Sequence, residues 1–559
     1  MVRRIRVLRS ASGRSRRSAR PGPLRWRCLA TSTAVGLLLI GAAGERPAQS
    51  QTPRPGGALV LTQWEDPPHG FAIHETSTIS TLWPAMPCFS NLVLFDPLRS
   101  VETADTIIGE LAERWEWRDA HRTLVFSLRK DVRWHDGRPF SSHDVKVTFD
   151  LVREAPGTAT RLRLNPRKDW YANVTAVEAP DPHTVVFQLR RPQPSLLSML
   201  ATGYGAVYAA HVPPERYRTE CVGTGPFRLR EWRRGGFIDY VKNPDYFVRD
   251  RPYLDSLRYL VIADRRTRMA ALQTGQVDAA FPVEWSRGLA EELTRAVPHL
   301  TLTVASANVY DNLVFNVTRP PFDDVRARRA VSHAVDRRAL IAAVHQGGAV
   351  VGAAMAPPPQ GVWGVAQADL AAWPGHGRPE DDKASARRLL TELGYGPGRP
   401  LRIEMVTRNI PGYLDLSAFV IDELRKVGVE ATLRAVESGQ LGILLTRGEF
   451  QMAANLTGLG PDDPDANLYE NFGCGSPRNY ARHCSDALTQ LIEEQSREPD
   501  GGRRLLLVHG AQRRIEEEAA RAILAWRLTY YVAWPHVRNL VPHQSAYNWG
   551  RMQEVWRDR

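Results

Sequence analysis

Hydrophobic and polar residues alternate along the stretch RTLVFSLRKDVRW, and this alternation predicts two short strands. A period of two places every second side chain on the same face of a strand, so the pattern is typical of a strand pair with one buried face. The stretch is followed by His-Asp-Gly, which favours a turn because glycine tolerates positive φ angles. The apolar positions are Leu124, Phe126, Leu128, Val132 and Trp134.

The pattern changes after residue 141 from a period of two to the period of a helix. Ser141 is followed three residues later by Asp144, which predicts a helix N-cap with an acidic residue in the first turn. Four positions then recur at the spacing of one helix face, i, i+3, i+4 and i+7. These positions are Val145, Thr148, Phe149 and Val152.

The same stretch contains two His-Asp pairs, His135-Asp136 and His143-Asp144, which raise the question of a metal or catalytic site. The first pair falls in the predicted turn and the second in the first turn of the predicted helix. A zinc protease would carry HExxH, with both histidines on one helix face, and the sequence lacks that motif. We therefore interpret both pairs as architecture.

Amphipathic helices alternate with strands along the rest of the chain, which favours α/β layers. Residues 383–394 and 418–428 are each predicted to form a helix that ends at a glycine. Residues 323–341 predict a long helix capped by Asp323 or Asp324, with a buried stripe and an arginine-rich face that we expect to be solvated. A chain of 559 residues is too long to fold around a single hydrophobic core, so two or three lobes are expected.

Charge is concentrated at the start of the chain. Residues 1–50 hold 11 arginines and one acidic residue, while the remainder holds 62 basic and 60 acidic residues. A nearly neutral body argues against a nucleic-acid partner. The basic head precedes the apolar run 28–43, which is shorter than the roughly 20 residues of a membrane-spanning helix. Residues 1–50 therefore resemble a cleaved export signal, which implies a periplasmic protein, with an uncleaved anchor as the alternative.

Four cysteines follow this head, and an even number in an exported chain suggests disulfides. Cys474 and Cys484 flank the short polar loop CGSPRNYARHC, which is suited to a disulfide clip. Zinc binding is the alternative, but the sequence has no CxxC pair.

Four stretches in order resemble the extracellular solute-binding proteins of the dipeptide, oligopeptide and nickel class, which serve ABC importers. They are LAERWEWRDAHRTLVFSLRKDVRWHDGRPFSSHDVKVTFDLV, VGTGPFRLREWRRGGFIDYVKNPDYF, YLDSLRYLVIADRRTRMAALQTGQVDAA and LVFNVTRPPFDDVRARRAVSHAVDRRALI. The resemblance covers nearly all of the exported chain. It also suggests a second disulfide between Cys88 and Cys221, because Cys221 lies just before the GTGPF motif, where the family often has a cysteine.

The resemblance implies an α/β, two-lobed periplasmic-binding-protein fold with a hinge. Its expected parts are lobe I at 51–258 with an extra subdomain at about 85–220, lobe II at 259–530, and a return to lobe I at 531–559. A solute held in the cleft would shift the equilibrium toward a closed form that the permease subunits of the importer recognise. Such a protein needs no catalytic residue, cofactor or metal, and we expect a monomer.

The stretch IEMVTRNIPGYLD resembles the segment where dipeptide binders present an arginine for the ligand carboxylate, and that arginine falls on Arg408. The fork of a guanidinium suits a bidentate carboxylate. A surface loop arginine is the alternative.

The amine-binding aspartate of dipeptide binders falls on Leu459 or Gly460, so the expected carboxylate is missing. Asp462 or Asp463 are candidates to replace it, or they only shape the loop beside Pro464. Two pocket tryptophans of the family fall on Leu456 and Ser438. These departures leave room for another solute, such as a modified peptide, an opine-like conjugate or chelated nickel.

Aromatic residues are further candidates for the cleft wall, with a role in the core as the alternative. They are Trp64, Tyr413, Tyr469 and Trp363. A secreted hydrolase is the rival function, but the sequence lacks GxSxG as well as HExxH. The most consistent interpretation is a solute-binding protein that captures a small peptide or peptide-like solute. A sensory role, in which the closed form docks a receptor, would be compatible with transport.

Overall fold

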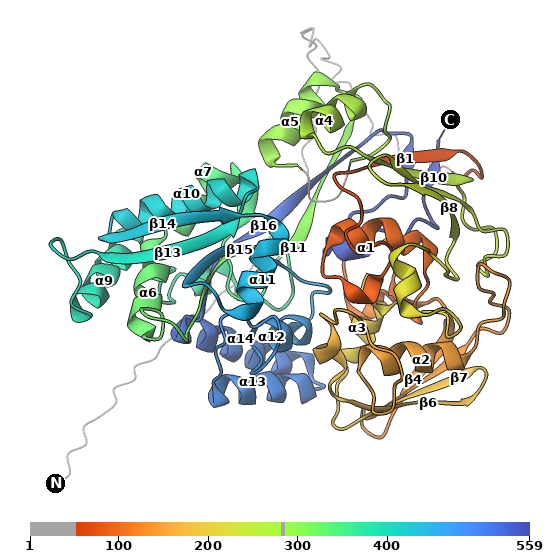
Figure 1. Ribbon diagram of the computed structural model, residues 1–559, viewed down its shortest axis with the longest axis horizontal. Coiled ribbons are helices and arrows are strands. Elements are labelled where there is room, and N and C mark those ends of the chain that lie inside the picture. The colour runs from red at the N-terminus through yellow and green to blue at the C-terminus, as the bar shows by residue number, and fades with distance from the viewer. Residues whose placement is uncertain (1–51, 281–284, 559) are drawn as a thin grey trace, which may run out of the picture. The chain divides into compact units, whose positions relative to one another are not determined.

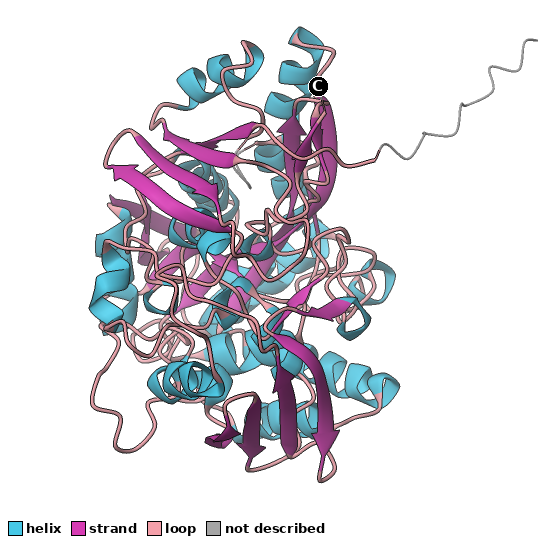
Figure 2. Ribbon diagram, turned by 90° about the vertical axis from the view of Figure 1, so that its right-hand side faces the viewer, coloured by secondary structure: helices cyan, strands magenta, loops and turns pink. Residues whose placement is uncertain are grey.

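The computed structural model describes residues 52–280 and 285–558 (Figure 1). The predicted export signal therefore lies outside the described residues. Within them, no helix has the length and apolar character needed to cross a membrane. Helices and strands are interspersed, with helices packed against sheets (Figure 2).

A four-stranded sheet contains the first strand of the described chain. Its order is β1 (Ala58–Gln63), β10 (Ser256–Val261), β9 (Phe237–Lys242) and β8 (Phe227–Arg233). β1 runs parallel to β10, and the other pairs are antiparallel. The predicted strand after GTGPF is thus confirmed as β8.

Another antiparallel sheet of four strands carries the stretch with the alternating pattern. Its order is β4 (Ala112–Arg118), β5 (Thr123–Leu128), β7 (Thr184–Leu189) and β6 (Val174–Asp181). Helix α2 (Ser142–Val152) packs against β6 and β7. A small hairpin joins β2 (Val93–Phe95) to β3 (Ile107–Gly109).

The six-stranded sheet is built from the second half of the chain. Its order is β12 (Ala349–Val350), β16 (Arg521–Ala533), β11 (Thr301–Phe315), β15 (Met452–Gly458), β13 (Leu401–Arg408) and β14 (Val429–Val436). β13 runs parallel to both β14 and β15. Four helices share one hydrophobic core with this sheet: α6 (Val325–Ala334), α7 (Arg337–His345), α9 (Pro379–Glu392) and α10 (Pro411–Arg425).

The remaining α-helices lie in the connections between strands. They are α1 (Ile79–Ala85), α3 (Leu196–Ala201), α4 (Arg265–Gln273), α5 (Arg287–Ala296), α8 (Gln367–Leu370), α11 (Ser438–Arg447), α12 (Pro464–Phe472), α13 (Asp486–Arg497) and α14 (Gly501–Glu518). A short ribbon pairs β17 (Val537–Arg538) with β18 (Trp556–Arg557).

The hydrophobic residues form separate cores. The largest joins buried residues between Leu59 and Tyr259 with a C-terminal group that includes Trp549 and Val555. Another joins buried residues from Leu313 to Ala525 around the six-stranded sheet. More than one core is expected for a chain of this length.

The alternating stretch forms one strand where two were predicted. β5 is confirmed, but residues 132–140 form a turn held by a single bridge between Arg133 and Pro139. The turn closes on itself because the backbone N–H of Trp134 donates to the Arg138 carbonyl oxygen. The helix after it is confirmed as α2, and Ser141 and Asp144 form its capping box.

The predicted long helix at 323–341 is broken into α6 and α7. Asp324 caps the first helix, and Asp336 caps the second with hydrogen bonds to two backbone N–H groups. The arginine-rich face is not solvated as a whole. Arg328 and Arg337 are buried. Burial is tolerated because their guanidinium groups donate hydrogen bonds to backbone carbonyl oxygens: those of Phe322 and Glu518 for Arg328, and those of Ile523 and Gly375 for Arg337.

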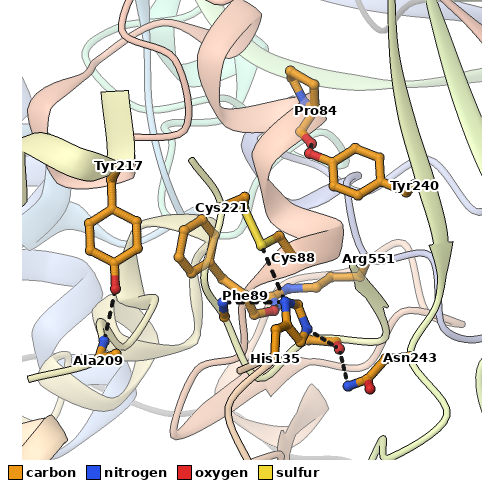
Figure 3. Close-up of a disulfide and its surroundings, with 12 residues drawn as sticks. Pro84, Cys88, Phe89, His135, Ala209, Tyr217, Cys221, Tyr240, Asn243 and Arg551 are labelled. Atoms are coloured by element: carbon orange, nitrogen blue, oxygen red, sulfur yellow. Dashed lines mark hydrogen bonds between the residues drawn. A yellow bond between two sulfur atoms is a disulfide. The ribbon is translucent and has the colours of Figure 1, made fainter. Parts of the chain in front are cut away.

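Both expected disulfides are present, Cys88–Cys221 and Cys474–Cys484. Figure 3 shows His135 beside the first of them. The ring of His135 contacts Cys88 Sγ at 3.8 Å and the Gly225 carbonyl oxygen at 3.0 Å, and its backbone N–H donates to the Gly223 carbonyl oxygen at 2.8 Å. Burial lowers the pKa of His135 to about 4, so the ring is neutral at physiological pH.

The glycines of GTGPF are required by this packing. A Cβ atom on Gly223 would lie 1.8 Å from the Cys88 carbonyl oxygen, and one on Gly225 would lie 2.5 Å from the Cys88 carbonyl carbon. The first His-Asp pair is thus architecture, because His135 joins the GTGPF segment to the disulfide and Asp136 binds the His211 ring and the backbone N–H of Arg138 within the turn. Among the described residues, no group of three or more His, Cys, Asp or Glu side chains is arranged to hold a metal ion.

Candidate ligand-binding site

Arg408 is the last residue of β13, at the edge where parallel strands end. In open α/β sheets, ligands bind outside the carboxyl ends of the strands. The Arg408 Nη1 donates to the Tyr413 hydroxyl at 2.7 Å, and the guanidinium lies 5.2 Å from the Tyr413 ring centroid. The Nε atom is buried without a hydrogen-bond partner in the described part of the chain. The structure therefore brings together two of the predicted site residues, and the hydrogen-bond partner of the cation is a neutral phenol.

β15 ends beside Arg408's strand, at the position where the amine-binding aspartate of dipeptide binders would fall. Leu459 is buried in a core with Tyr310 and Trp526, so its side chain is committed to packing. A Cβ atom on Gly460 would lie 2.7 Å from the Trp170 ring. Neither residue supplies a carboxylate, and Gly460 leaves no room for one unless Trp170 moves.

Asp463 caps helix α12 and is held in a buried ion pair. One of its carboxylate oxygens accepts from the backbone N–H of Asp465 at 2.9 Å. Arg504 donates to the same carboxylate at 2.8 and 3.2 Å. Burial raises the pKa of Asp463 even though the charge of Arg504 lowers it. Asp463 thus shapes the loop and already has a cationic partner.

Asp462 is buried and lies near a second buried acid, Glu102. One oxygen of Asp462 accepts from the Val362 N–H at 2.9 Å, and the other has no hydrogen-bond partner among the described residues. Burial raises the pKa of Asp462 to about 7. Burial raises the pKa of Glu102 to about 8, and the charge of Asp462 adds to this effect.

Helix α12 contacts residues far away in the sequence. Glu470 accepts from Arg167 Nη1 at 2.9 Å and from the Trp170 indole N–H at 3.0 Å, and it also pairs with Arg478. Asp465 accepts from the Ser195 hydroxyl. The hydroxyl of Tyr469 accepts from Arg191, so this predicted site residue contacts a protein group.

Aromatic rings pack against one another beside these ion pairs. The centroids of Trp170 and Tyr204 are 6.0 Å apart, and those of Tyr204 and Tyr547 are 5.6 Å apart. The Arg167 guanidinium lies 4.1 Å from the Tyr204 ring centroid. A Cβ atom on Gly458, the last residue of β15, would lie 2.6 Å from the Tyr547 hydroxyl oxygen.

The other predicted aromatic residues have protein partners. The indole of Trp64 donates to the Ser80 hydroxyl at 2.8 Å, just after β1. The indole of Trp363 donates to the Asp462 carbonyl oxygen at 3.0 Å, and Arg504 lies 4.6 Å from its ring centroid. The side chain of Ser438 is not among those described.

Sequence reasoning did not identify the buried group of charged and aromatic residues described above: Arg167, Trp170, Tyr204, Glu470, Arg478 and Tyr547. Of these residues, only Arg478 lies in a segment that the sequence had singled out, the predicted disulfide loop between Cys474 and Cys484. No local pattern links Arg167 to Glu470, because 303 residues separate them.

Comparison with known proteins places the chain in a family. Residues 106–479, more than half of the chain, match the bacterial extracellular solute-binding proteins, family 5. The chain belongs to this family. This solute-binding protein is similar to a probable di/tripeptide-binding protein of Pseudomonas aeruginosa, with 26% identity over 490 residues that cover 83% of this chain and 90% of that relative.

Two solved structures resemble the fold. One is the periplasmic binding protein DppA from Helicobacter pylori in complex with the peptide STSA, with a TM-score of 0.77, 22% identity, and coverage of 90% of this chain and 99% of that one. The other is AgaA from A. tumefaciens R10 in complex with agropinic acid, with a TM-score of 0.77, 21% identity and the same coverage. The solute-binding protein therefore has the two-lobed α/β fold of periplasmic binding proteins, as the sequence predicted.

Proposed function

We propose that the protein is the periplasmic solute-binding component of an ABC importer and that it captures a small peptide or peptide-like solute. The observation that carries the proposal is Arg408 at the carboxyl end of β13, half-buried and hydrogen-bonded to the neutral Tyr413. A ligand carboxylate would supply the charged acceptor that this cation lacks in the described protein. Family membership supports the role in transport.

The solute would lie between lobe I, at 51–258 and 531–559, and lobe II, at 259–530. The separate hydrophobic cores support this division, because the larger one includes both the first strands and the C-terminal residues up to Val555. The contacts of Arg167, Trp170 and Ser195 with helix α12 join the two proposed lobes. Opening of the hinge would break these contacts, and a bound solute would favour the closed form.

The proposed contacts of the solute differ in how well the structure supports them. Arg408 and Tyr413 would hold a carboxylate. Asp462 remains a candidate for a polar group of the solute, because one of its oxygens has no partner among the described residues. Asp463, Tyr469 and Trp64 would act through the loops that they hold in place, since each already contacts a protein group.

A second form of the proposal is a solute other than a peptide with a free amine, such as an opine-like conjugate or chelated nickel. It is favoured by the apolar Leu459 and the crowded Gly460 at the expected amine site. AgaA, the neighbour with bound agropinic acid, supports the idea that this fold accepts such ligands.

The test is a thermal-shift panel of dipeptides, oligopeptides, opine-like conjugates, sugars and nickel chelates. A ligand that binds only the native state raises the melting temperature by mass action. We expect a clear shift with a solute that carries a carboxylate. Shifts with sugars alone would contradict the proposed role of Arg408.

We further propose that the closed form docks on permease subunits, that the protein works as a monomer, and that residues 1–50 are removed on export. Binding of the solute-loaded protein to membranes that contain the permease would test the docking.

A further inference from the structure

Buried guanidinium groups outnumber their carboxylate partners next to the proposed solute site. Arg167 and Arg478 both pair with Glu470, and only 2% of the Arg167 side chain and 15% of the Arg478 side chain are exposed. Arginine stays protonated in proteins, so burial cannot remove these charges. Two buried cations thus share a single carboxylate.

A third buried arginine adds to the excess. Arg521, at the start of β16, is 1% exposed, and its hydrogen bonds go to neutral acceptors on Thr457, Asn471 and Arg478. The Nε atoms of Arg167, Arg478 and Arg521 are buried without a partner among the described residues. A buried charge without a counter-ion is costly, so this arrangement favours an added anion.

The acidic residues nearby do not offset the excess. Asp463 and Asp465 share Arg504, which leaves one carboxylate of that group over. Arg191 offsets this carboxylate, because it donates to the Tyr469 hydroxyl and has no carboxylate partner among the described residues. Asp169 lies near Glu470, and its pKa is raised by burial and by the charge of that neighbour. Counted together, the five arginines of this region exceed its four acidic residues by one positive charge, even when Asp169 is included.

This cationic group and Arg408 lie around the same tyrosine. β15, the neighbour of the Arg408 strand β13, ends at Gly458, where a Cβ atom would lie 2.6 Å from the Tyr547 hydroxyl oxygen. The charges of Arg478, Arg167 and Glu470, and the Tyr413 hydroxyl that binds Arg408, also act on the pKa of Tyr547. Tyr547 also contacts Tyr204, whose ring is covered by the Arg167 guanidinium. Arg408 and the Arg167–Arg478 pair thus lie near two parts of one site.

Apart from Asp462, the positions where an ammonium partner is expected supply no available carboxylate. Leu459 faces a core, Gly460 is crowded by Trp170, and Asp463 is already paired with Arg504. We propose, on the basis of the function proposed above, that the solute is a dianion without a free amine: one acidic group binds Arg408 and the second binds the Arg167–Arg478 pair.

The test uses three matched probes and calorimetric titration of the purified protein. Ala-Ala has a free amine and one carboxylate, N-acetyl-Ala-Ala has one carboxylate and no amine, and N-succinyl-Ala-Ala has two carboxylates and no amine. A charge-assisted hydrogen bond contributes about 1.5–3 kcal/mol, so the succinyl compound should bind about tenfold or more tightly than the acetyl compound. Ala-Ala should bind most weakly.

The binding order of the three probes distinguishes a failure of the dianion assignment from a failure of solute binding itself. Tightest binding of Ala-Ala would overturn the dianion while leaving the solute-binding role intact, and it would assign the amine to Asp462. Equal binding of the acetyl and succinyl compounds would also overturn it. If none of the three binds, both the dianion and the peptide form of the proposed function are wrong.

A variant locates the second acidic group. Arg478→Gln should abolish the preference for the succinyl compound, so that both blocked probes bind equally. The matched control is Arg482→Gln, an exposed arginine of the same disulfide loop, which should keep the preference. A preference that survives in folded Arg478→Gln would overturn the assignment. If that variant does not fold, the probe series on the unmodified protein still decides the charge of the solute.

Discussion

The surroundings of His135 and those of Arg408 differ in how completely their polar groups are satisfied. His135 contacts two backbone carbonyl oxygens and Cys88, and burial keeps its ring neutral. Arg408 keeps its charge and has a phenol as its hydrogen-bond partner, and the nearby buried arginines outnumber Glu470. A cluster whose groups are satisfied stabilises the fold, whereas unbalanced buried charge indicates a place for a ligand.

We expect the largest effect on stability at the Cys88–Cys221 disulfide beside His135. Replacing both cysteines, Cys88→Ser with Cys221→Ser, should lower the free energy of unfolding by about 4 kcal/mol, because the bridge closes a long loop. The sequence separation is 133 residues. Denaturant unfolding measures the change. Solute affinity should stay unchanged in the folded variant, and a large loss of affinity would mean that this cluster belongs to the site.

The second region should show the opposite behaviour. Arg408→Ala should weaken binding of a carboxylate solute by about a hundredfold, since it removes a charge-assisted hydrogen bond of about 1.5–3 kcal/mol, with little effect on stability. The matched control is Arg402→Ala on the same strand, where the exposed arginine pairs with Glu430. Calorimetric titration of both variants gives the answer. Unchanged affinity in Arg408→Ala would refute its assignment.

A smaller effect is expected from the buried acids near the site. The pKa of Glu102 is raised from 4.5 to about 8, so the folded state retains a proton that the unfolded state has lost at neutral pH. The resulting stability is fully present below about pH 4.5 and is lost as the pH rises toward 8. Glu102→Gln should therefore reduce the fall in melting temperature between about pH 6.5 and 8.5.

Between about pH 6.5 and 8.5 the neighbouring His543 does not contribute to the change in stability. Burial lowers the pKa of His543 to about 4, and its ring lies 3.7 Å from Glu102, so it opposes folding only below about pH 6.5. Asp462, with a pKa of about 7, would leave a residual slope in Glu102→Gln. A slope as steep as that of the unmodified protein would show that Glu102 does not carry the effect.

Local patterns in the sequence predicted the parts of the fold that depend on neighbouring residues. The capping box of Ser141 and Asp144 and the clip between Cys474 and Cys484 are examples. Arg337 was expected to be solvated, but it binds the carbonyl oxygen of Ile523, 186 residues away. Such a partner leaves no trace in the periodicity of the helix.

The candidate site was predictable only in part for the same reason. Arg408 and Tyr413 lie five residues apart, at the end of one strand and the start of the next helix, so a single resembling segment identified both. The excess of positive charge arises from Arg167, Arg478 and Arg521, which come from three distant segments. Only the folded chain shows that they share Glu470 and its surroundings.

The most direct test of solute capture by hinge closure is small-angle X-ray scattering of the purified protein, with and without the solute that gives the largest thermal shift. The account predicts a smaller radius of gyration with the solute, because the contacts of Arg167 and Trp170 with helix α12 would form in the closed state. A bound solute that leaves the radius of gyration unchanged would contradict it.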